Sequence, residues 1–492
     1  MAVSSRTAPR LSKSKRRELR IRAARKARQT RRQIRRHYQD LPPPAGSFFE
    51  TFAPVFRRPT FLRFALLAVA TLLTVGNRTV CNVLRTAGLL APGHPSAYHR
   101  LFSCRRWSLL GLGRCLAGWI LDRLVPVGPV ELAGDDTVDE HPGDKVYGKG
   151  CHRDAVRSSH RFTAFRWGHK WLVVFVLVAI PGARRLWALP IFVILCHSEK
   201  EDRKHGRRHH TPAQRLLQAL LVLRRWFPHR AFILAADGGF ASHELTSRAV
   251  RLAKKTTYVS RFYPKAGLYE PPPVVRLKPN GKRLTPGRSR VKGAKRDTPE
   301  QVVAKTKERT RRKVSWYGGE DRQVEVVTGT GHWYKAGQGL VQVRWVYVHD
   351  VSGTHRDEYF YSTDVAMTAQ QIIETYTRRW NVETTFQEMR SYLGLETTRG
   401  WKKETVLRAA PCLFGLYSVV VCLYRMTPAK YQEKSGVQWA GKQQRTFSDA
   451  LTCVRKWLWV EWVFATAGQK QAFENLPEDF QDMLLNGLAP AA

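Results

Sequence analysis

Acidic residues are scarce in this chain of 492 residues. Asp and Glu together number 39 against 83 Lys and Arg, which gives a formal net charge of +44. A polypeptide with such an excess of one sign repels itself unless a polyanion neutralises it. We therefore expect nucleic acid as the leading partner, with an anionic membrane surface as the alternative.

Paired cysteines are missing as well. The eight cysteines are scattered along the chain, and no CxxC pair occurs among them. This argues against a disulfide framework and against a cysteine-based zinc finger, and it favours a reducing compartment. The histidines near residues 205–210 follow no regular metal-ligand spacing and have cationic neighbours, so we do not expect them to hold a transition metal.

Long uninterrupted apolar runs are also lacking. Each of the four apolar stretches is too short, or is interrupted by charged residues, proline or a turn: Phe64–Val75, Trp107–Leu124, Trp171–Cys196 and Val406–Met426. None is a clean run of the length that crosses a bilayer. We expect a soluble chain with buried helices and strands and no membrane partner.

The chain begins with a basic arm, residues 1–44. Its first 40 residues carry 15 Lys or Arg against only Glu18 and Asp40. Few apolar residues interrupt them, so the arm cannot form a core of its own. We predict that it lies on phosphates, with a solvated tail or a targeting signal as the alternatives. Three prolines at positions 42–44 mark its end.

Residues 45–125 have apolar side chains at helical spacing and predict an all-helical, DNA-binding domain. Two short amphipathic segments in it, Thr79–Leu89 and Ala97–Leu110, are compatible with a helix-turn-helix. A plain helical bundle explains the same pattern equally well.

The pattern changes at Pro126. Three strands in a meander come first, and helices and strands alternate after them, which favours an α/β domain with a mixed sheet. The expected strands are Val130–Ala133, Ser159–Trp167, Trp171–Ala179, Arg185–His197, Phe232–Ala236 and Thr256–Arg261, and the expected helices are Thr211–Trp226 and Ser242–Lys254. Gly168-His169 is expected to separate the second strand from the third.

Residues 126–263 form the first part of this core, and residues 264–370 interrupt it. Between residues 271 and 313 there are 15 Lys or Arg against three acids, and several strands are expected within 314–362. Residues 371–430 then return to the core as helices, and residues 431–492 are expected to be a small helical appendix.

Four carboxylates stand at positions suited to chemistry. Asp135 and Asp136 follow the first expected strand, and Asp237 follows another and precedes two glycines. Glu383 lies on an expected helix. Converging carboxylates can hold a pair of Mg²⁺ ions, which activate water and stabilise the leaving oxygen at a phosphate. Taken singly, each acid is more often a turn or capping residue.

The helix around Glu383 carries a more specific pattern. Tyr376, Arg379, Glu383 and Arg390 follow one another at offsets of three, four and seven residues, which places them on one face of a single helix. A carboxylate with two guanidinium groups suits a metal-bound phosphate flanked by further phosphates. A surface stripe of ion pairs is the alternative.

This pattern resembles the Tyr-x2-Arg-x3-Glu-x6-Lys signature of bacterial insertion-sequence transposases of the DDE type, with Arg390 in place of the Lys. Asp136-Thr137 after a strand, and the segment Ile233-Leu-Ala-Ala-Asp237-Gly-Gly-Phe, are similar to the family's other two motifs. The resemblance covers roughly residues 130–400 by the order and spacing of the motifs.

The resemblance implies an RNase H-like core, a mixed α/β sheet flanked by helices, with a β-rich insertion before Glu383. It implies that Asp136, Asp237 and Glu383 bind Mg²⁺ or Mn²⁺. Asp135 competes with Asp136, and the Thr that follows favours Asp136.

The resemblance also implies DNA contacts. Tyr376, Arg379 and Arg390 would touch the phosphates of the transposon end. Some relatives stack a flipped base on a tryptophan of the insertion, for which Trp316, Trp333 and Trp345 are candidates. Buried core aromatics are the more ordinary role for at least two of these three.

We therefore expect a DNA transposase that cuts double-stranded DNA at element ends and joins them to target DNA. It would act as a homodimer on paired ends, in the bacterial cytoplasm and in association with the nucleoid. A nuclease that cuts without joining, or a catalytically idle DNA-binding protein derived from a transposase, are the alternatives. The intact acids favour an enzyme over the idle protein.

Overall fold

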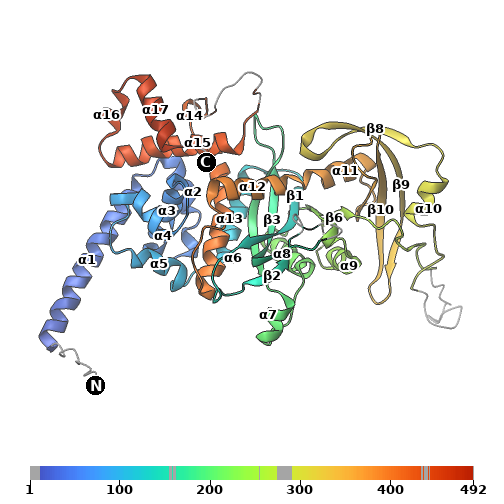
Figure 1. The fold of residues 1–492 in the computed structure, drawn as a ribbon, viewed down its shortest axis with the longest axis horizontal. Helices are drawn as coiled ribbons and strands as arrows, with labels where there is room; N and C mark the ends of the chain where they lie inside the picture. The colour runs from blue at the N-terminus through green and yellow to red at the C-terminus, as the bar shows by residue number, and fades with distance from the viewer. Residues whose placement is uncertain are drawn as a thin grey trace. The chain divides into compact units, whose positions relative to one another are not determined.

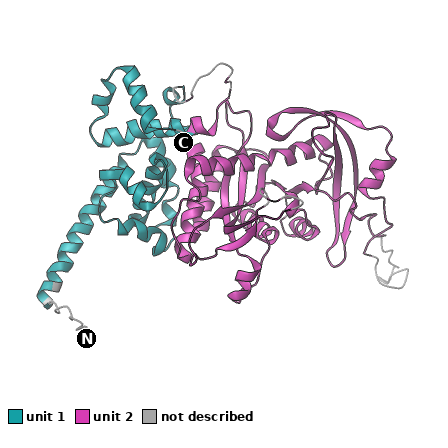
Figure 2. Cartoon of the chain, in the orientation of Figure 1, with its two compact units in different colours: residues 1–108, 423–435, 451–492 teal, residues 109–422, 436–450 magenta. Residues whose placement is uncertain are grey.

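The computed structural model divides into two units, which Figure 2 shows in different colours. The helical unit contains residues 1–108, 423–435 and 451–492, and the sheet unit contains residues 109–422 and 436–450. Residues 109–125, which we expected in the helical domain, therefore lie with the sheet. The structure describes residues 12–154, 158, 162–253, 255–273, 291–433, 436, 442 and 444–490.

The helical unit is built from helices at both ends of the chain. They are α1 (Lys13–Gln39), α2 (Pro43–Glu50), α3 (Arg58–Leu73), α4 (Val80–Ala87), α5 (Ser96–Ser103), α14 (Ala429–Glu433), α16 (Lys470–Glu474) and α17 (Glu478–Leu488). The helix α15 (Phe447–Leu458) runs from the sheet unit into this one and continues as a π-helical segment, Trp459–Phe464. Both segments proposed for a helix-turn-helix contain a short helix, α4 and α5.

Residues 13–39 of the basic arm form a long helix, α1 (Figure 1). Its cap is Ser12, whose hydroxyl accepts the N–H of Lys15 at 3.3 Å. Ile34 and Tyr38 near its C-terminal end are buried, and the indole of Trp462 donates to the carbonyl of His37 at 2.9 Å. The last turns of α1 therefore belong to the core of the helical unit, and the preceding turns expose the basic side chains.

Among the described residues, the sheet unit holds one mixed sheet of eleven strands in the order β2-β3-β1-β5-β6-β11-β10-β9-β7, with β4 also beside β3 and β8 also beside β9. The strands are β1 (Val130–Glu140), β2 (Gly150–Arg153), β3 (Phe165–Val178), β4 (Trp187–Cys196), β5 (Phe232–Ala236), β6 (Thr256–Arg261), β7 (Leu268–Tyr269), β8 (Thr310–Ser315), β9 (Asp321–Lys335), β10 (Gly339–Asp350) and β11 (Glu358–Ser362).

The predicted α/β fold class is confirmed. Strands β1, β3 and β4 form an antiparallel meander, and β5 and β6 then run parallel to β1. The helices between β4 and β11 are α7 (Glu199–Lys204), α8 (Pro212–Trp226), α9 (His243–Leu252) and α10 (Pro299–Lys305). Helix α6 (Leu109–Arg123) precedes the sheet, and α11 (Ala369–Arg378), α12 (Asn381–Leu393) and α13 (Lys403–Met426) follow it.

Two strand predictions are wrong in their bounds. The first strand does not end before Asp135 but continues to Glu140, because its antiparallel pairing with β3 continues to Glu140↔Gly168. Gly168 does not separate two strands but lies inside β3. A Cβ at that position would come within 2.1 Å of the carbonyl oxygen of Asp139. The glycine therefore permits a close approach of two backbones rather than a turn.

The two faces of β1 are covered by different helices. Leu216 of α8 lies where a side chain on Gly134 would project, 2.7 Å from the position of its absent Cβ. On the other face, Arg390 of α12 donates to the hydroxyl of Thr137 at 2.6 Å. Since successive residues of a strand point to opposite faces, Asp135 shares the α12 face with Thr137, and Asp136 shares the α8 face with Gly134.

The insertion continues the core sheet. Strand β11 pairs antiparallel with β6, and β10 and β9 follow outward (Figure 1). A buried cluster that includes Trp316, Val346, Phe360 and Tyr376 joins the insertion to α11. The insertion therefore connects the strand that precedes Asp237 with the helices that carry Tyr376 and Glu383. Residues 274–290 of the basic stretch lie outside the described residues.

Among the described residues, α13 is a helix long and apolar enough to cross a membrane by length and composition. The apolar window in α13 is 72% buried, as in the core helix of a soluble protein, which meets the same criterion. Ser418 donates to the carbonyl of Pro190 on β4 at 2.8 Å, which ties the helix to the sheet.

Candidate active site

Strand register brings two of the predicted acids together. The parallel pairing of β1 with β5 ends at Gly134↔Ala236, so Asp135 and Asp237 are the next residues on the two strands. Side chains in register on neighbouring parallel strands point to the same face of a sheet. The two carboxylates therefore lie together where β5 ends beside the middle of β1, and the carboxyl end of a parallel strand is where ligands of open α/β sheets bind.

The segment after β5 is held in place from β6. The hydroxyl of Ser260 donates to the carbonyl of Ala236 at 2.7 Å, and that of Tyr258 donates to the carbonyl of Phe240 at 2.9 Å. The intervening Gly239 has no heavy atom within 4 Å of where a Cβ would stand. Asp237 thus begins an anchored turn that remains open on one side.

Arg379 joins three of the acids. Its Nη1 lies 2.8 Å from Asp135 Oδ2, and its Nη2 lies 3.7 Å from Asp237 Oδ1 and 3.5 Å from Glu383 Oε1. The Arg379 residue is only 5% exposed. Asp237 and Glu383 are about half exposed, at 43% and 49% of their side chains, so this acid cluster of Asp135, Asp237 and Glu383 opens to solvent on their side.

Tyr376 contacts the acid cluster from the buried side, through Asp237. Its hydroxyl donates to Asp237 Oδ1 at 3.0 Å, and its ring stacks on Phe360 with centroids 4.4 Å apart. Tyr376 is fully buried. The side chain therefore orients Asp237 from within the core.

Asp136 has a different partner, Lys170 of β3, whose Nζ lies 3.1 Å from its Oδ1. Both residues are about three-quarters buried. The structure thus brings Asp135, Asp237 and Glu383 to one guanidinium and places Asp136 beside an ammonium group on the other face of β1. The sequence analysis did not identify Lys170, which lies inside β3.

Burial and the repulsion between neighbouring carboxylates shift the pKa values of the acids. Burial raises the pKa of Asp135 to about 7, against the attraction of Arg379, and the neighbouring Asp136 and Asp237 add to the rise. Burial also raises the pKa of Asp136 and of Glu383. Asp237 differs: burial opposes its ionisation, but Arg379, the Gly238 N–H and Tyr376 together lower its pKa.

The donor set suits a hard divalent cation. Carboxylate oxygens are the ligands that Mg²⁺ prefers, and crowded acids with raised pKa values are stabilised by a cation between them. In this structure the positive charge among them is the Arg379 guanidinium. Within the described part of the chain, no group of three His, Cys, Asp or Glu side chains is close enough to hold a metal ion. A metal would therefore require these carboxylates to draw closer together.

The predicted signature helix is not one helix. Helix α11 ends at Arg378 and α12 begins at Asn381. Between them the N–H groups of Arg379 and Trp380 bond the carbonyls three residues back, at 3.2 and 3.0 Å, which tightens the turn. Arg379 and Glu383 nevertheless remain in contact across this turn.

The predicted phosphate contacts of Tyr376 and Arg379 do not agree with this structure. Both side chains are buried against the acids, so neither presents its polar group to a DNA backbone. Arg390 is different, because a third of its side chain is exposed while it bonds Thr137 and Glu396. Its contact with DNA remains a prediction.

The three candidate stacking tryptophans all lie in the core. Trp316, Trp333 and Trp345 are 4%, 6% and 2% exposed. Trp333 packs against Phe262 and His243, at 5.3 and 4.8 Å between ring centroids. Each ring is covered by the packing of the insertion in this structure, and base stacking on one of them stays a prediction.

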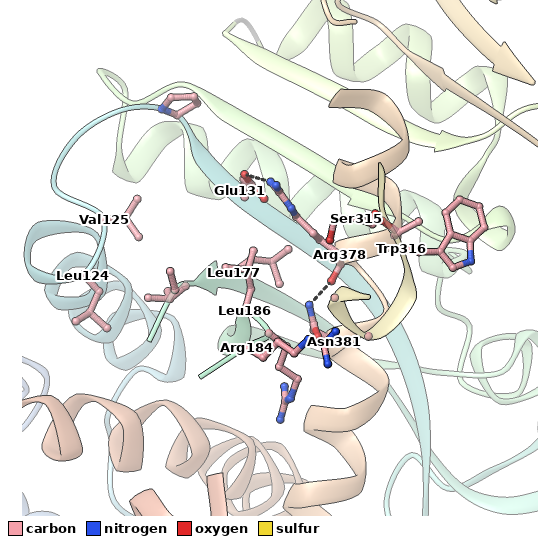
Figure 3. Close-up of a pocket in the computed structure, with 17 residues that line it drawn as sticks. Leu124, Val125, Glu131, Leu177, Arg184, Leu186, Ser315, Trp316, Arg378 and Asn381 are labelled. Carbon is pink, nitrogen blue, oxygen red and sulfur yellow. Dashed lines mark hydrogen bonds and ion pairs between the residues drawn. The ribbon is translucent and has the colours of Figure 1, made fainter. Parts of the chain in front are cut away.

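A cavity of about 440 Å³ lies near the turn between α11 and α12 but is not lined by the acid cluster (Figure 3). Glu131, Arg378 and Asn381 are among its lining residues, and Arg378 Nη1 lies 3.0 Å from Glu131 Oε1. Glu131 stands four residues before Asp135 on β1. The candidate active site is thus a surface at the end of β5, separate from this cavity.

Two buried histidines of the sheet unit, His152 and His169, each contribute a loss of stability on acidification. Burial lowers the pKa of His152 and of His169 to about 4 in each case, and the two residues are 8% and 1% exposed. In the unfolded chain a histidine titrates near 6.5. Between pH 6.5 and 4 each of these histidines binds a proton in the unfolded state but not in the folded state, so the histidines' contribution to the free energy of unfolding falls as pH drops. Asp135 and Asp139, whose pKa values burial raises to about 7, act in the opposite direction, so the histidine contribution is measured as the difference between wild type and a histidine variant.

Each histidine contributes up to about 3 kcal/mol over that range, at about 1.4 kcal/mol per unit of pKa. Urea melts at several pH values measure the effect. The variant His169→Gln should lose stability less steeply below pH 6.5 than the wild type, because glutamine does not titrate in this range. Glutamine can still donate to the Tyr147 carbonyl, which His169 Nε2 contacts at 2.9 Å. Equal pH dependence of the two proteins would contradict the assignment.

Comparison with known proteins shows the family. A family profile described as DDE superfamily endonuclease matches residues 51–323, and one described as archaeal putative transposase ISC1217 matches residues 303–420. Seven chains of solved structures are similar. One is the piggyBac transposase in a synaptic complex with hairpin DNA, at 10% identity and a TM-score of 0.37, covering 88% of this chain and 77% of that one. No curated protein matches. The family matches confirm the predicted resemblance to DDE-type transposases.

Proposed function

We propose that this chain, which belongs to the DDE superfamily of endonucleases, is a DNA transposase that cuts double-stranded DNA at transposon ends and joins the ends to target DNA. The observation that carries the proposal is the convergence of Asp135, Asp237 and Glu383 on one buried guanidinium. The three acids come from the strand β1, the turn after β5 and the helix α12, which are far apart in the sequence. A surface stripe of ion pairs along one helix would not bring them together.

The acids would hold Mg²⁺ or Mn²⁺, which when bound supplies a more acidic water and stabilises the leaving oxygen of a phosphodiester. The other side chains position these carboxylates. Tyr376 fixes Asp237 by a hydrogen bond, and Arg379 holds Asp135 by an ion pair. Arg390, partly exposed next to Thr137, is placed to meet a phosphate near the cluster.

The first acid of the site can be either member of the Asp135-Asp136 pair. The sequence context, with Thr137 following, favours Asp136. The geometry favours Asp135, which lies on the same face as α12 and next in register to Asp237. We propose Asp135 as the first metal ligand on geometric grounds, with Asp136 and Lys170 as its supporting ion pair.

DNA would be held by the positive charge that the chain carries. We propose double-stranded transposon ends and target as partners, a homodimer as the simplest assembly that holds two ends, and the nucleoid of a bacterial cytoplasm as the location. The helix α1 with its exposed basic side chains, and the helix pair α4–α5, would contribute to binding.

Removing the exposed part of the basic arm should weaken DNA binding. Deletion of residues 1–28 removes 11 Lys or Arg and one Glu, and leaves the buried Ile34 and Tyr38 in place. We expect lower affinity and a flatter plot of log affinity against log salt, because fewer counterions are released from the DNA. Fluorescence anisotropy over a salt series measures both. An unchanged slope would mean that the arm does not contact DNA.

The proposed function is tested by excision. Purified protein is incubated with Mg²⁺ and a plasmid that carries the DNA flanking its own gene on both sides. We expect release of the element and its appearance in a second plasmid. Cutting without any joined product would favour a nuclease, and DNA binding without cutting would favour an idle DNA-binding protein.

A further inference from the structure

Two aromatic side chains of β3 are exposed beyond the acid cluster. Phe165 is 65% exposed and Trp167 is 62% exposed. Neighbouring large rings left in water gain no free energy from burial. Grouped exposure of this kind marks a surface that binds a partner.

The two rings share the face of the sheet that carries Asp135. Trp171 lies opposite Thr137, and its indole donates to Asp139 on the same face at 3.4 Å. Counting back along β3 in steps of two leads from Trp171 to Trp167 and Phe165. Val173 lies opposite Asp135, so Trp167 stands six residues, or roughly 20 Å, along the strand from the acids.

Cations alternate with these rings. Arg153 lies opposite Phe165 on the edge strand β2, and the side chain of Arg153 is exposed. Lys149 Nζ lies 6.0 Å from the centre of the Trp167 ring. Arg390, between the rings and the acid cluster, bonds Thr137. Aromatic faces with interleaved cations are the composition of sites for single-stranded nucleic acid.

A third exposed ring belongs to the same area. Trp401 is 55% exposed, with Lys402 Nζ 5.5 Å from its ring centre, and its carbonyl accepts the N–H of Tyr147 at 2.9 Å. Lys403 Nζ lies 5.7 Å from the Tyr147 ring. Exposed acids are also present in these segments, namely Glu140, Asp144 and Glu404. The Glu140 carboxylate is engaged by Arg166 at 2.9 Å, so the cations predominate.

We propose that the aromatic surface formed by Phe165, Trp167 and Trp401 binds a DNA strand with unpaired bases next to the acid cluster. The bases stack on the rings, and Lys149 and Arg153 contact the phosphates. Intact duplex is the poorer occupant, because its base faces are already stacked on one another. A second copy that docks through the same surface is also disfavoured, since it would bring Lys149 and Arg153 against the same cations of the other copy. The inference rests on the proposed action on DNA.

The test measures binding of a fluorescein-labelled oligothymidylate and of a mixed-sequence duplex of equal length to the full chain. Phe165→Ala/Trp167→Ala should bind the single strand about tenfold more weakly or worse, as removal of stacking platforms does. Duplex binding should change little. Phe165→Tyr/Trp167→Phe keeps ring faces and should bind like wild type. Phe480→Ala removes a 46% exposed ring on α17 and serves as the matched control.

Several results would overturn the inference. They are unchanged single-strand binding by the alanine variant, equal loss on the duplex, or equal loss in the ring-preserving variant. A shift in oligomeric state of the alanine variant with normal strand binding would assign the surface to a second copy instead. Ring-dependent strand binding by a protein that never cuts DNA would leave this inference standing and refute the transposase. Cutting and joining by a protein whose strand binding does not depend on the rings would support the transposase and refute this inference.

Discussion

We expect Asp237→Asn and Glu383→Gln each to lose almost all DNA cleavage while DNA binding persists. Each change keeps the size of the side chain and removes a negative charge from the cluster where Arg379 now balances three acids. Loss of a metal-holding carboxylate costs several kcal/mol of transition-state stabilisation. At about 1.4 kcal/mol per tenfold change, the rate should fall roughly a thousandfold. Cleavage of end-labelled transposon DNA measures the rate, and gel shift measures the binding.

The adjacent pair Asp135 and Asp136 provides an internal control. Asp135→Asn should lose cleavage as completely as Asp237→Asn, because its carboxylate lies on the α12 face and 2.8 Å from Arg379. Asp136→Asn should be milder, because its carboxylate pairs with Lys170. The sequence context of Thr137 predicts the opposite ranking. An inactive Asp136→Asn beside an active Asp135→Asn would therefore restore Asp136 as the first acid.

Arg379→Ala loses both stability and cleavage. The Arg379 side chain is buried, and its removal leaves Asp135 facing Asp237 and Glu383 without their shared cation. Breaking a buried ion pair by removing one partner destabilises by about 3–5 kcal/mol. Cleavage should fall as well, since misplaced carboxylates lose the positioning on which the rate depends. Thermal melts and the cleavage assay measure the two effects.

Magnesium should restore part of the lost stability. A divalent cation that binds the folded state raises its melting temperature, so Mg²⁺ should stabilise Arg379→Ala more than the wild type. The matched control is Arg378→Ala, whose guanidinium is 36% exposed and pairs with Glu131 at 3.0 Å. Exposed pairs contribute at most about 1 kcal/mol. If the two variants melt and cut alike, Arg379 is not the central counterion of the site.

Much of the fold follows from local sequence. The strand Phe232–Ala236 ends where Asp237 begins, as predicted, and the expected helix Thr211–Trp226 is present as α8. The failure at Gly168 has a physical cause. A glycine in a strand pattern indicates either a turn or a close backbone approach. At Gly168 it is the close approach, because the carbonyl of Asp139 occupies the space that a Cβ would need. That carbonyl belongs to another strand and is invisible in the local pattern.

In the candidate site, too, local spacing predicts some contacts, and contacts between distant segments determine the others. The spacing of Arg379 and Glu383 predicts their contact, and the contact is present. Which of Asp135 and Asp136 faces α12 depends on strand register, since a shift of one residue exchanges the two faces. The burial of Tyr376 could not be read from its own helix, because Asp237 and Phe360 come from distant strands. Helical spacing predicted a shared face but not its orientation toward the core.

In the function that we propose, this acid cluster cuts and joins DNA. The most direct measurement supplies pre-cut transposon ends with a free 3′-hydroxyl, together with a target plasmid and Mg²⁺ or Mn²⁺, to wild type and to Asp237→Asn. The account predicts that wild type links the ends to the plasmid and that Asp237→Asn, which still binds the ends, produces no joined product. Joined product from Asp237→Asn at the wild-type rate, or none from wild type with either metal while uncut ends are cleaved, would contradict it.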